Sequence, residues 1–289
     1  MLYFSKKPGD KMRKIVPIFL ISLVVLAACD SNSIIKEKLN QHKEVALMIK
    51  EQVPEEFIPQ DVKVVSIGDS LTQGVGDSTN RGGYVPYLEK LLEEDKSIND
   101  ALFDNFGIKG NRSDQLLKKL ASSDVRDAVK EADYVIVTIG GNDVMKVVRE
   151  NLSNLNLKAF NKQRKIYEKN LKNVLTAVRN DNPNSKIILV GLYNPFFKWF
   201  ADIREINEII GEWNLASQDV LMNYPNTYFV EIADLFYEEG DNLLHTDYFH
   251  PNDKGYELIA NRIFAIINKE VLEKDLAVPH TAENKENGN

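Results

Sequence analysis

Two short segments, far apart in the chain, carry side chains that could together make a serine nucleophile. The first, Val64-Val65-Ser66-Ile67-Gly68-Asp69-Ser70-Leu71, runs from β-branched residues to a serine close to a glycine. The second, Asp247-Tyr248-Phe249-His250-Pro251, places a carboxylate three residues before a histidine. A serine hydroxyl attacks a carbonyl when a base accepts its proton and a partner holds that base in one tautomer. The pattern therefore predicts Ser70 as nucleophile, His250 as base and Asp247 as the orienting partner.

The chain has few histidines that could act as the base. Of the four histidines in the chain, two lie in predicted tails, which leaves His245 and His250 as candidate bases. Pro251 favours an extended backbone at His250 and so fixes the imidazole at a corner before the next helix. Each piece also has an ordinary structural explanation, because a serine or aspartate after a strand often caps a helix. An aspartate and a histidine before a helix are also a common surface pair.

Two glycine-containing segments lie between the serine and the histidine. They read Gly107-Ile108-Lys109-Gly110-Asn111 and Gly140-Gly141-Asn142-Asp143. The side-chain amide of Asn142 and the backbone N–H of Gly110 could both donate hydrogen bonds to a developing oxyanion. The alternatives are that Asn142 or Asp143 caps a helix and that Gly110 makes a turn.

The chain between these segments alternates between strand-like and helix-like patterns. Short β-branched runs predict buried strands over residues 62–67, 101–106, 134–139, 186–192 and 227–232. Helical periodicity predicts helices over 85–93, 113–120, 163–179, 204–222 and 253–272. Strands that are apolar on consecutive positions suit a parallel sheet covered on both faces. The pattern predicts an α/β fold, a three-layer α/β/α sandwich of about five parallel strands, with the four segments meeting at the carboxyl ends of the strands.

The first 28 residues have the features of a secretion signal. Five basic residues precede an apolar stretch over 15–28, which is too short to cross about 30 Å of hydrocarbon comfortably. The stretch ends in Leu26-Ala27-Ala28-Cys29, and Cys29 is the one cysteine of the chain. Small residues before a cleavage point are typical of signal peptides. We expect cleavage before Cys29 and lipid on its thiol. The alternatives are an uncleaved anchor and a plain secretory signal.

The sequence therefore predicts four regions with different roles. Residues 1–28 are the signal peptide, and 29–61 form a partly helical tether in which two prolines end any helix before the domain. Residues 62–273 form the domain, and 274–289 form a polar, disordered tail. The tether would hold the domain off the membrane on the extracytoplasmic side.

The charge of the chain argues against binding to nucleic acid. It carries 36 Lys and Arg against 43 Asp and Glu, a net charge of −7, and removal of the basic signal region makes the remainder more acidic. Nucleic-acid binding needs clustered positive charge. Such an acidic protein gains no attraction to anionic lipid, so membrane attachment would have to come from the lipid on Cys29.

The four segments resemble the motifs of the SGNH hydrolases, also called GDSL esterases and lipases. That family is named for a Ser, a Gly, an Asn and a His in four separated blocks. Here the blocks are Gly68-Asp69-Ser70-Leu71, Gly110 within its loop, Gly140-Gly141-Asn142-Asp143, and Asp247-Tyr248-Phe249-His250. The resemblance covers about residues 62–268, and all four blocks occur in order. The Gly-x-Ser-x-Gly turn of the larger α/β-hydrolase family is absent around Ser70.

The resemblance implies a flavodoxin-like α/β/α fold and a serine esterase or lipase that needs neither a metal nor an organic cofactor. It implies Ser70 as nucleophile, His250 as base and Asp247 as orienting residue. It further implies an oxyanion hole from the backbone of Ser70, the backbone of Gly110 and the side chain of Asn142. Within the family, the chain looks most similar to bacterial lipoproteins of the lysophospholipase-like branch, with a small-molecule or lipid ester as substrate.

Other functions remain open from the sequence. His245, Asp247 and His250 could ligate a metal, although nothing else supplies a matching cluster. The fold could serve a glycan O-deacetylase or a non-catalytic lipoprotein that binds lipid or glycan.

An aromatic cluster, Pro195-Phe196-Phe197-Lys198-Trp199-Phe200, follows the fourth predicted strand. It could line an acyl-binding wall or enter a membrane interface, because aromatic residues suit both environments. Core packing beneath a loop is the alternative.

Overall fold

The chain divides into two units, and the residues described here belong to the second, Pro59–Asn289. The computed structural model describes residues 59–151, 156–196, 204–237 and 242–268. The predictions for the signal peptide, for Cys29 and for the tail at 274–289 lie outside the described residues. So does all of the tether except its last three residues, 59–61.

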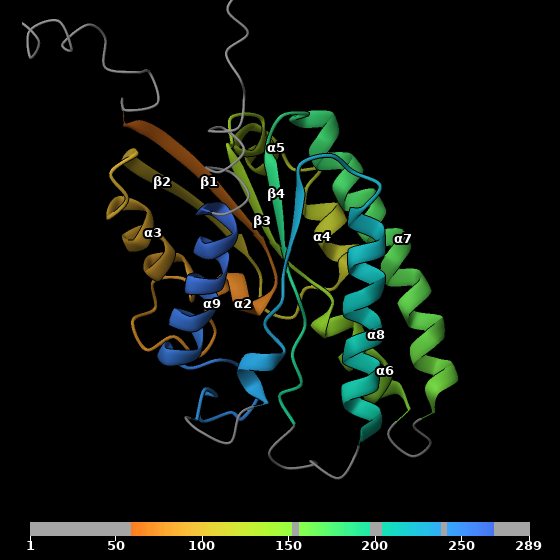
Figure 1. The fold of residues 1–289 in the computed structure, drawn as a ribbon. Coiled ribbons are helices and arrows are strands. Elements are labelled where there is room, and N and C mark those ends of the chain that lie inside the picture. Colours follow the sequence, from red (N-terminus) through yellow and green to blue (C-terminus); the bar gives the residue numbers. More distant parts are fainter. Residues whose placement is uncertain (1–58, 152–155, 197–203, 238–241, 269–289) are drawn as a thin grey trace, which may run out of the picture. The chain divides into compact units, whose positions relative to one another are not determined.

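The centre of the described unit is a parallel sheet with the strand order β2-β1-β3-β4-β5 (Figure 1). The strands are β1 (Gln60–Gly68), β2 (Ile98–Gly107), β3 (Tyr134–Thr138), β4 (Lys186–Val190) and β5 (Thr227–Val230). Every pair of neighbours is parallel. The predicted five-stranded sheet is confirmed, and each predicted strand overlaps an observed one.

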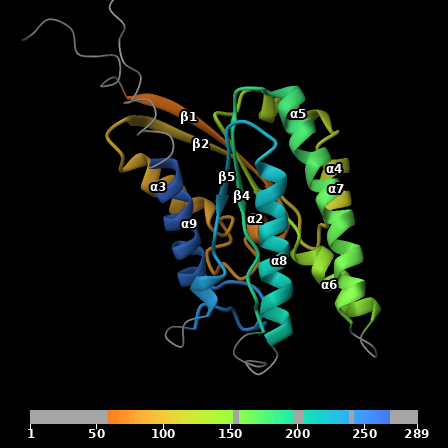
Figure 2. The ribbon, with the colours of Figure 1, turned by 45° about the vertical axis from the view of Figure 1, so that its right-hand side comes forward.

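Helices cover both faces of this sheet, which confirms the predicted three-layer fold (Figures 1 and 2). The helices are α2 (Ser70–Gln73), α3 (Val85–Glu93), α4 (Ser113–Lys119), α5 (Ser123–Lys130), α6 (Gly141–Glu150), α7 (Leu157–Asp181), α8 (Arg204–Leu221) and α9 (Asp253–Ile267), with a short 3₁₀ helix η2 (Asp234–Phe236). Helices α3 and α9 pack together on one face, while α4, α5, α6 and α8 all pack on α7 at the other.

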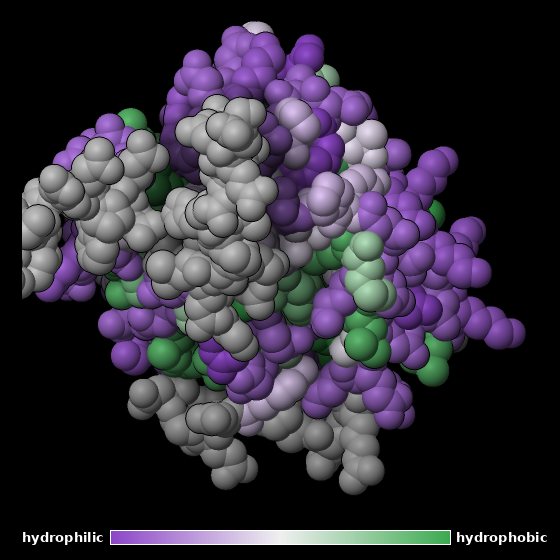
Figure 3. Space-filling model, turned by 45° about the horizontal axis from the view of Figure 1, so that its top comes forward, coloured by the Kyte–Doolittle hydropathy of each residue, from purple (hydrophilic) through white to green (hydrophobic). Residues whose placement is uncertain are grey.

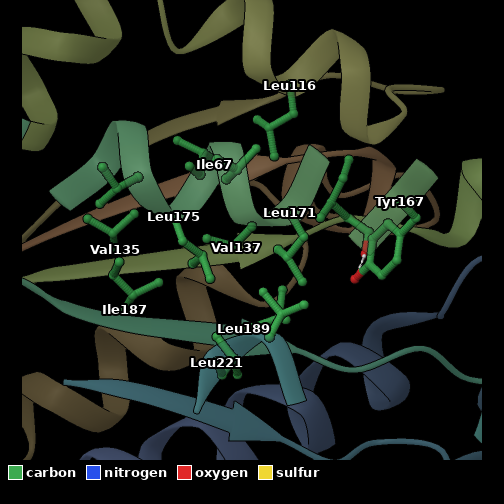
Figure 4. Packing of buried hydrophobic residues seen from close by; sticks show 14 of the residues in the cluster. Ile67, Leu116, Val135, Val137, Tyr167, Leu171, Leu175, Ile187, Leu189 and Leu221 are labelled. Carbon is green, nitrogen blue, oxygen red and sulfur yellow. Dashed lines mark hydrogen bonds between the residues drawn. The ribbon is translucent and has the colours of Figure 1, made fainter. Parts of the chain in front are cut away.

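Two hydrophobic clusters explain why the strands are apolar on consecutive positions. Val64 of β1 belongs to the cluster beneath α3 and α9, whereas the next residue, Val65, belongs to the cluster beneath α7. Successive side chains of a strand point to opposite faces, so a sheet covered twice must be apolar throughout. Figure 4 shows Leu171 and Leu175 of α7 against Val137 in the second of these clusters.

The order in which strands are added to the sheet reverses between β1 and β3, whose carboxyl ends lie side by side. The chain leaves β1 for β2 on one side and then returns to place β3 on the other. In open α/β sheets the crevice at this point is where ligands bind. The surface of the opposite end, turned forward in Figure 3, is mostly hydrophilic where it is coloured. In the described part of the chain, no helix combines the length and apolar character needed to span a bilayer.

Candidate active site

The turn after β1 places Ser70 at the start of α2. Gly68 has φ 152°, and a Cβ on it would lie 2.2 Å from the carbonyl oxygen of Thr138 at the end of β3. Only glycine therefore lets the two strand ends approach so closely. Asp69 then caps α2, since its carboxylate accepts a hydrogen bond from the Leu71 N–H. Ser70 follows as the first residue of α2, with 3% of its surface exposed.

The histidine lies on a loop that closes on itself before α9. Leu244 and Pro251 form an antiparallel bridge, and the N–H of His245 donates to the carbonyl oxygen of His250 at 2.8 Å. Asn252 caps α9 by accepting from the N–H of Gly255. The loop is therefore fixed at both ends, as expected for a group that must hold one orientation.

A tyrosine that follows β4 contacts the same loop. The hydroxyl of Tyr193 donates to the carbonyl oxygen of Phe249 at 2.6 Å, and its ring stacks on Phe236 at 4.0 Å. The Phe249 ring in turn meets the His250 ring edge-on at 5.0 Å. Tyr193 is thus a positioning residue that the sequence pattern did not single out, because its contact depends on the folding of a loop 56 residues away.

Three of the predicted residues come together through hydrogen bonds. Nε2 of His250 lies 3.0 Å from Oγ of Ser70, and Nδ1 lies 2.6 Å from Oδ2 of Asp247. The other carboxylate oxygen of Asp247 accepts from the backbone N–H groups of Phe249 and His250, each at 3.0 Å. His250 is buried, with 8% of its surface exposed.

The ionisation of Asp247 fixes the tautomer of the neutral histidine. Burial acts to raise the pKa of Asp247, but hydrogen bonds from the His250 ring and from two backbone N–H groups outweigh it and lower the pKa to about 2. An ionised carboxylate only accepts hydrogen bonds, so Nδ1 of His250 must carry the proton. Nε2 is then left to accept the proton of the Ser70 hydroxyl, which is the arrangement that a general base requires.

Asn142 lies beside this group at the start of α6. It lines a small pocket of about 40 Å³ together with Ser70, Gly141 and Phe249. Its side-chain Nδ2 donates to the carbonyl oxygen of Asn111 at 3.0 Å. An amide NH₂ has two hydrogens, so this bond holds the side chain in place and leaves the second hydrogen for a ligand.

Gly110 belongs to the loop after β2. The N–H of Ile108 donates to the carbonyl oxygen of Gly68 at 3.1 Å, so the loop after β2 lies against the turn that carries Ser70. Gly110 has φ 83°, with no atom within 4 Å of where a Cβ would be. Gly110 is absent from the described residues that line the small pocket, whereas Asn142 is among them.

A buried hydrogen-bond network ties the two predicted oxyanion segments together. Asp143 accepts from both the backbone N–H and the hydroxyl of Ser113, at 2.9 and 2.7 Å. Asn170 of α7 donates to the same hydroxyl at 2.9 Å. The start of α4 is thereby bound to the start of α6. The sequence pattern treated Asp143 only as a possible cap and did not connect it with Ser113.

Asp69, next to Ser70, is a third residue whose contacts the sequence pattern did not predict. Its carboxylate accepts from the hydroxyl of Thr138 at 2.9 Å, and that hydroxyl also pairs with Thr72 at 2.8 Å. Burial raises the pKa of Asp69 to about 7, against the lowering effect of hydrogen bonds from Leu71 and Thr138. Near pH 7 this carboxyl group is therefore about half ionised, and it lines the small pocket together with Ser70.

A larger apolar pocket of about 530 Å³ adjoins the small one. Five residues line both, namely Gly141, Leu192, Tyr193, Pro195 and Phe249. Phe196, from the aromatic cluster, lines the larger pocket, whereas residues 197–200 lie outside the described part of the chain.

The histidines of the loop do not form a metal site in the described part of the chain. Within those residues no three His, Cys, Asp or Glu side chains are grouped so that they could hold a metal ion. Nε2 of His245 pairs instead with the hydroxyl of Thr246 at 3.1 Å.

The chain is similar to known lipases and related proteins in sequence and in fold. The sequence pattern of the GDSL-like lipase/acylhydrolase family matches residues 66–258. The uncharacterized protein YpmR of Bacillus subtilis is 37% identical over 228 residues, which cover 78% of this chain and 89% of that protein. The spore germination lipase LipC of Bacillus licheniformis is 25% identical over 208 residues, or 71% of this chain and 95% of that protein. The solved structure of the lipase Lip_vut3 from a goat rumen metagenome shares the fold, with a TM-score of 0.64 at 24% identity, over 71% of this chain and 96% of that one.

Proposed function

We propose that this chain, which belongs to the GDSL-like lipase/acylhydrolase family and is an ester hydrolase, uses Ser70, His250 and Asp247 as its catalytic triad. The observation that carries the proposal is the hydrogen-bonded series from Ser70 Oγ through the His250 ring to the Asp247 carboxylate. The ionised Asp247 holds the proton of a neutral imidazole on Nδ1, which leaves Nε2 facing the Ser70 hydroxyl as the proposed role of a base needs.

In the first half of the reaction, Nε2 of His250 takes the Ser70 proton while Oγ attacks the ester carbonyl carbon. The carbonyl oxygen becomes an oxyanion in a tetrahedral intermediate. The bond from carbon to the alcohol oxygen then breaks, and His250 gives its proton to the departing alcohol. Ser70 is left as an acyl ester. Asp247 stabilises the imidazolium while it exists.

The second half repeats these roles with water. His250 takes a proton from water, whose oxygen attacks the acyl carbon, and the serine ester bond breaks. The carboxylic acid leaves and Ser70 regains its proton. In both halves we assign the oxyanion to the N–H groups of Ser70 and Gly110 and to Nδ2 of Asn142. Such donors are effective because they are already in place when the charge develops.

We further propose that the enzyme acts outside the cytoplasm, held to the membrane by lipid on Cys29. The support is the basic segment, the apolar stretch over 15–28 and the Leu-Ala-Ala-Cys sequence that follows. An enzyme so placed meets membrane lipids and their breakdown products, which favours lysophospholipase-like activity within the family. The related lipase from Bacillus licheniformis is in keeping with a lipid ester.

The test is the hydrolysis of p-nitrophenyl esters by the wild type and by Ser70→Ala. Removing the nucleophile should lower turnover by roughly a millionfold while thermal unfolding stays unchanged. Ser123→Ala, at an exposed serine on α5, is the matched control and should keep full activity. Comparable activity in Ser70→Ala and the wild type would rule out the proposed nucleophile.

A further inference from the structure

One face of helix α6 forms a continuous apolar wall that begins beside Ser70. Gly141, Val144, Met145 and Val148 of this helix all line the 530 Å³ pocket. Residues spaced by three, four and seven lie on one side of an α-helix. The wall therefore extends from the first turn of α6 through its second.

Two other helices and the segment after β4 also line the pocket. Ile206, Ile209 and Ile210 come from α8 and Phe160 from α7. Both α6 and α8 pack on α7, and residues of all three helices line the pocket. Figure 2 shows the three helices on the same side of the sheet. Its volume is that of a small-molecule site, and its lining is mainly apolar.

The large pocket adjoins the small pocket that Ser70 lines. Gly141 and Phe249 line the large pocket and also the small one that contains Ser70. A substituent on the carbonyl carbon held at Ser70 can therefore pass between them into the large pocket. Of the polar side chains that line the larger pocket, Asn156 and Glu205 are exposed. Asn194 is buried, but its side-chain amide donates to Asn207 and its side-chain oxygen accepts from the Phe196 N–H.

The length of the apolar wall along α6 limits the length of acyl chain that the pocket can cover. An α-helix rises about 1.5 Å per residue, so the face from Gly141 to Val148 is about 10 Å long. Three bonds of an extended chain span about 3.5 Å, so about 10 Å covers roughly nine bonds. An acyl chain of about eight to ten carbons would fit this distance.

We propose that the pocket along α6 receives the acyl chain of the ester and that its length selects chains of medium length. This inference rests on the proposed attack by Ser70. The driving force is the removal of methylene groups from water, which grows with each group until the chain passes Val148. Acetyl groups leave the pocket empty, and so the structure favours lipid esters over acetylated glycans as substrates.

The test places a bulky side chain at two depths of the pocket. Val144→Phe blocks the first turn of the wall, and Val148→Phe blocks the second. The specificity constants are measured with p-nitrophenyl acetate, butyrate, octanoate and dodecanoate. The matched control is Arg149→Phe, which adds the same ring to the same helix at an exposed position outside the pocket. Met145→Phe provides a second block at the first turn if Val144→Phe folds poorly.

We expect the longest acyl chain that is hydrolysed well to depend on where the phenylalanine ring is placed. The wild type should prefer octanoate, and Val144→Phe should lose about tenfold or more on octanoate while keeping acetate hydrolysis. Val148→Phe should keep octanoate and lose dodecanoate relative to the wild type, and Arg149→Phe should match the wild type. A wild-type preference for acetate, an unchanged profile in both blocked variants, or an equal loss on all esters would overturn the inference.

Labelling of Ser70 by a short-chain fluorophosphonate separates this inference from the proposed function. Labelling together with a flat chain-length profile rejects the acyl pocket and retains the nucleophile. Failure of the wild type both to hydrolyse esters and to label at Ser70 rejects the proposed function and the acyl pocket with it.

Discussion

At the scale of single residues, Asp69, which precedes the proposed nucleophile in the chain, has a strongly raised pKa. Asp69 is 3% exposed, and burial raises its pKa from 3.8 to about 7. In the unfolded chain the same group ionises near its ordinary value. Between about pH 4 and 7 the folded protein therefore holds more protons at this residue than the unfolded chain does, so this group makes the fold less stable as pH rises.

Asp69→Asn should remove this dependence. Asparagine does not titrate, and its oxygen can still accept from the Leu71 N–H and the Thr138 hydroxyl. The free energy of unfolding of the wild type should fall relative to that of the variant between pH 4 and 7, and the difference should level off above pH 7. Urea unfolding of both proteins across this range measures it. Parallel stability curves would show that Asp69 keeps an ordinary pKa in the fold.

The residues of the proposed triad could be predicted from the sequence, whereas the residues that hold the site in place could not. Ser70, Asp247 and His250 were predicted from their types and local spacing, and the structure joins them by hydrogen bonds. The partnership of Asp69 with Thr138 depends on the pairing of two strands 69 residues apart, which no local pattern records. The catalytic roles of Ser70, Asp247 and His250 remain predictions.

At the scale of elements, the contact between α4 and α6 acts together with the hydrogen bond from Asn142 to Asn111 to hold the two proposed oxyanion segments in place. It is made by the buried Asp143 and Ser113, and burial raises the pKa of Asp143. A buried carboxylate that loses a hydrogen-bond donor is destabilised, and its helix is free to shift. A shift of α6 would move Asn142 away from the position that the oxyanion occupies.

Ser113→Ala should therefore lower kcat by about tenfold, the effect of one charge-assisted hydrogen bond, with little change in KM. Asn170→Ala is the control, because it removes a donor to Ser113 but keeps the Ser113 bond to Asp143. It should leave kcat within about twofold of the wild type. Steady-state kinetics with a short ester measures both. Equal kcat values for Ser113→Ala and the wild type would mean that this contact only stabilises the fold.

The elements themselves could largely be predicted from hydrophobic pattern. Helix α3 has the predicted bounds, whereas α7 begins at Leu157 rather than at residue 163, because Asn156 caps it from a polar stretch. Helix α5 was not predicted. It is short and buries only Val125, Ala128 and Val129, so its periodic signal is weak.

At the scale of the whole molecule, the sheet order brings segments from both ends of the domain to one crevice. The alternation of strand and helix predicted the layers, and parallel pairing placed Ser70 and His250, 180 residues apart, at the same edge. The pocket along α6 could not be predicted in this way. It depends on how α6 and α8 both pack on α7, which is a property of three helices together.

The proposed membrane attachment also concerns the whole chain. Since the protein is acidic, lipid on Cys29 would be the main source of membrane affinity. Cys29→Ala should move the protein from the membrane to the soluble fraction and leave hydrolysis of a soluble ester unchanged. Fractionation of cells that express each form measures this. A Cys29→Ala protein that still sediments with membranes after signal cleavage would contradict the lipid anchor.

The central claim is that Ser70 is a nucleophile activated by His250, and the most direct measurement is the site of covalent labelling by a fluorophosphonate. Peptide mapping by mass spectrometry should find the phosphonyl group on Ser70 of the wild type. The reaction should be slowed strongly in His250→Ala, because that variant has lost the base. Labelling of a different serine, or labelling of Ser70 at the same rate without His250, would contradict the account.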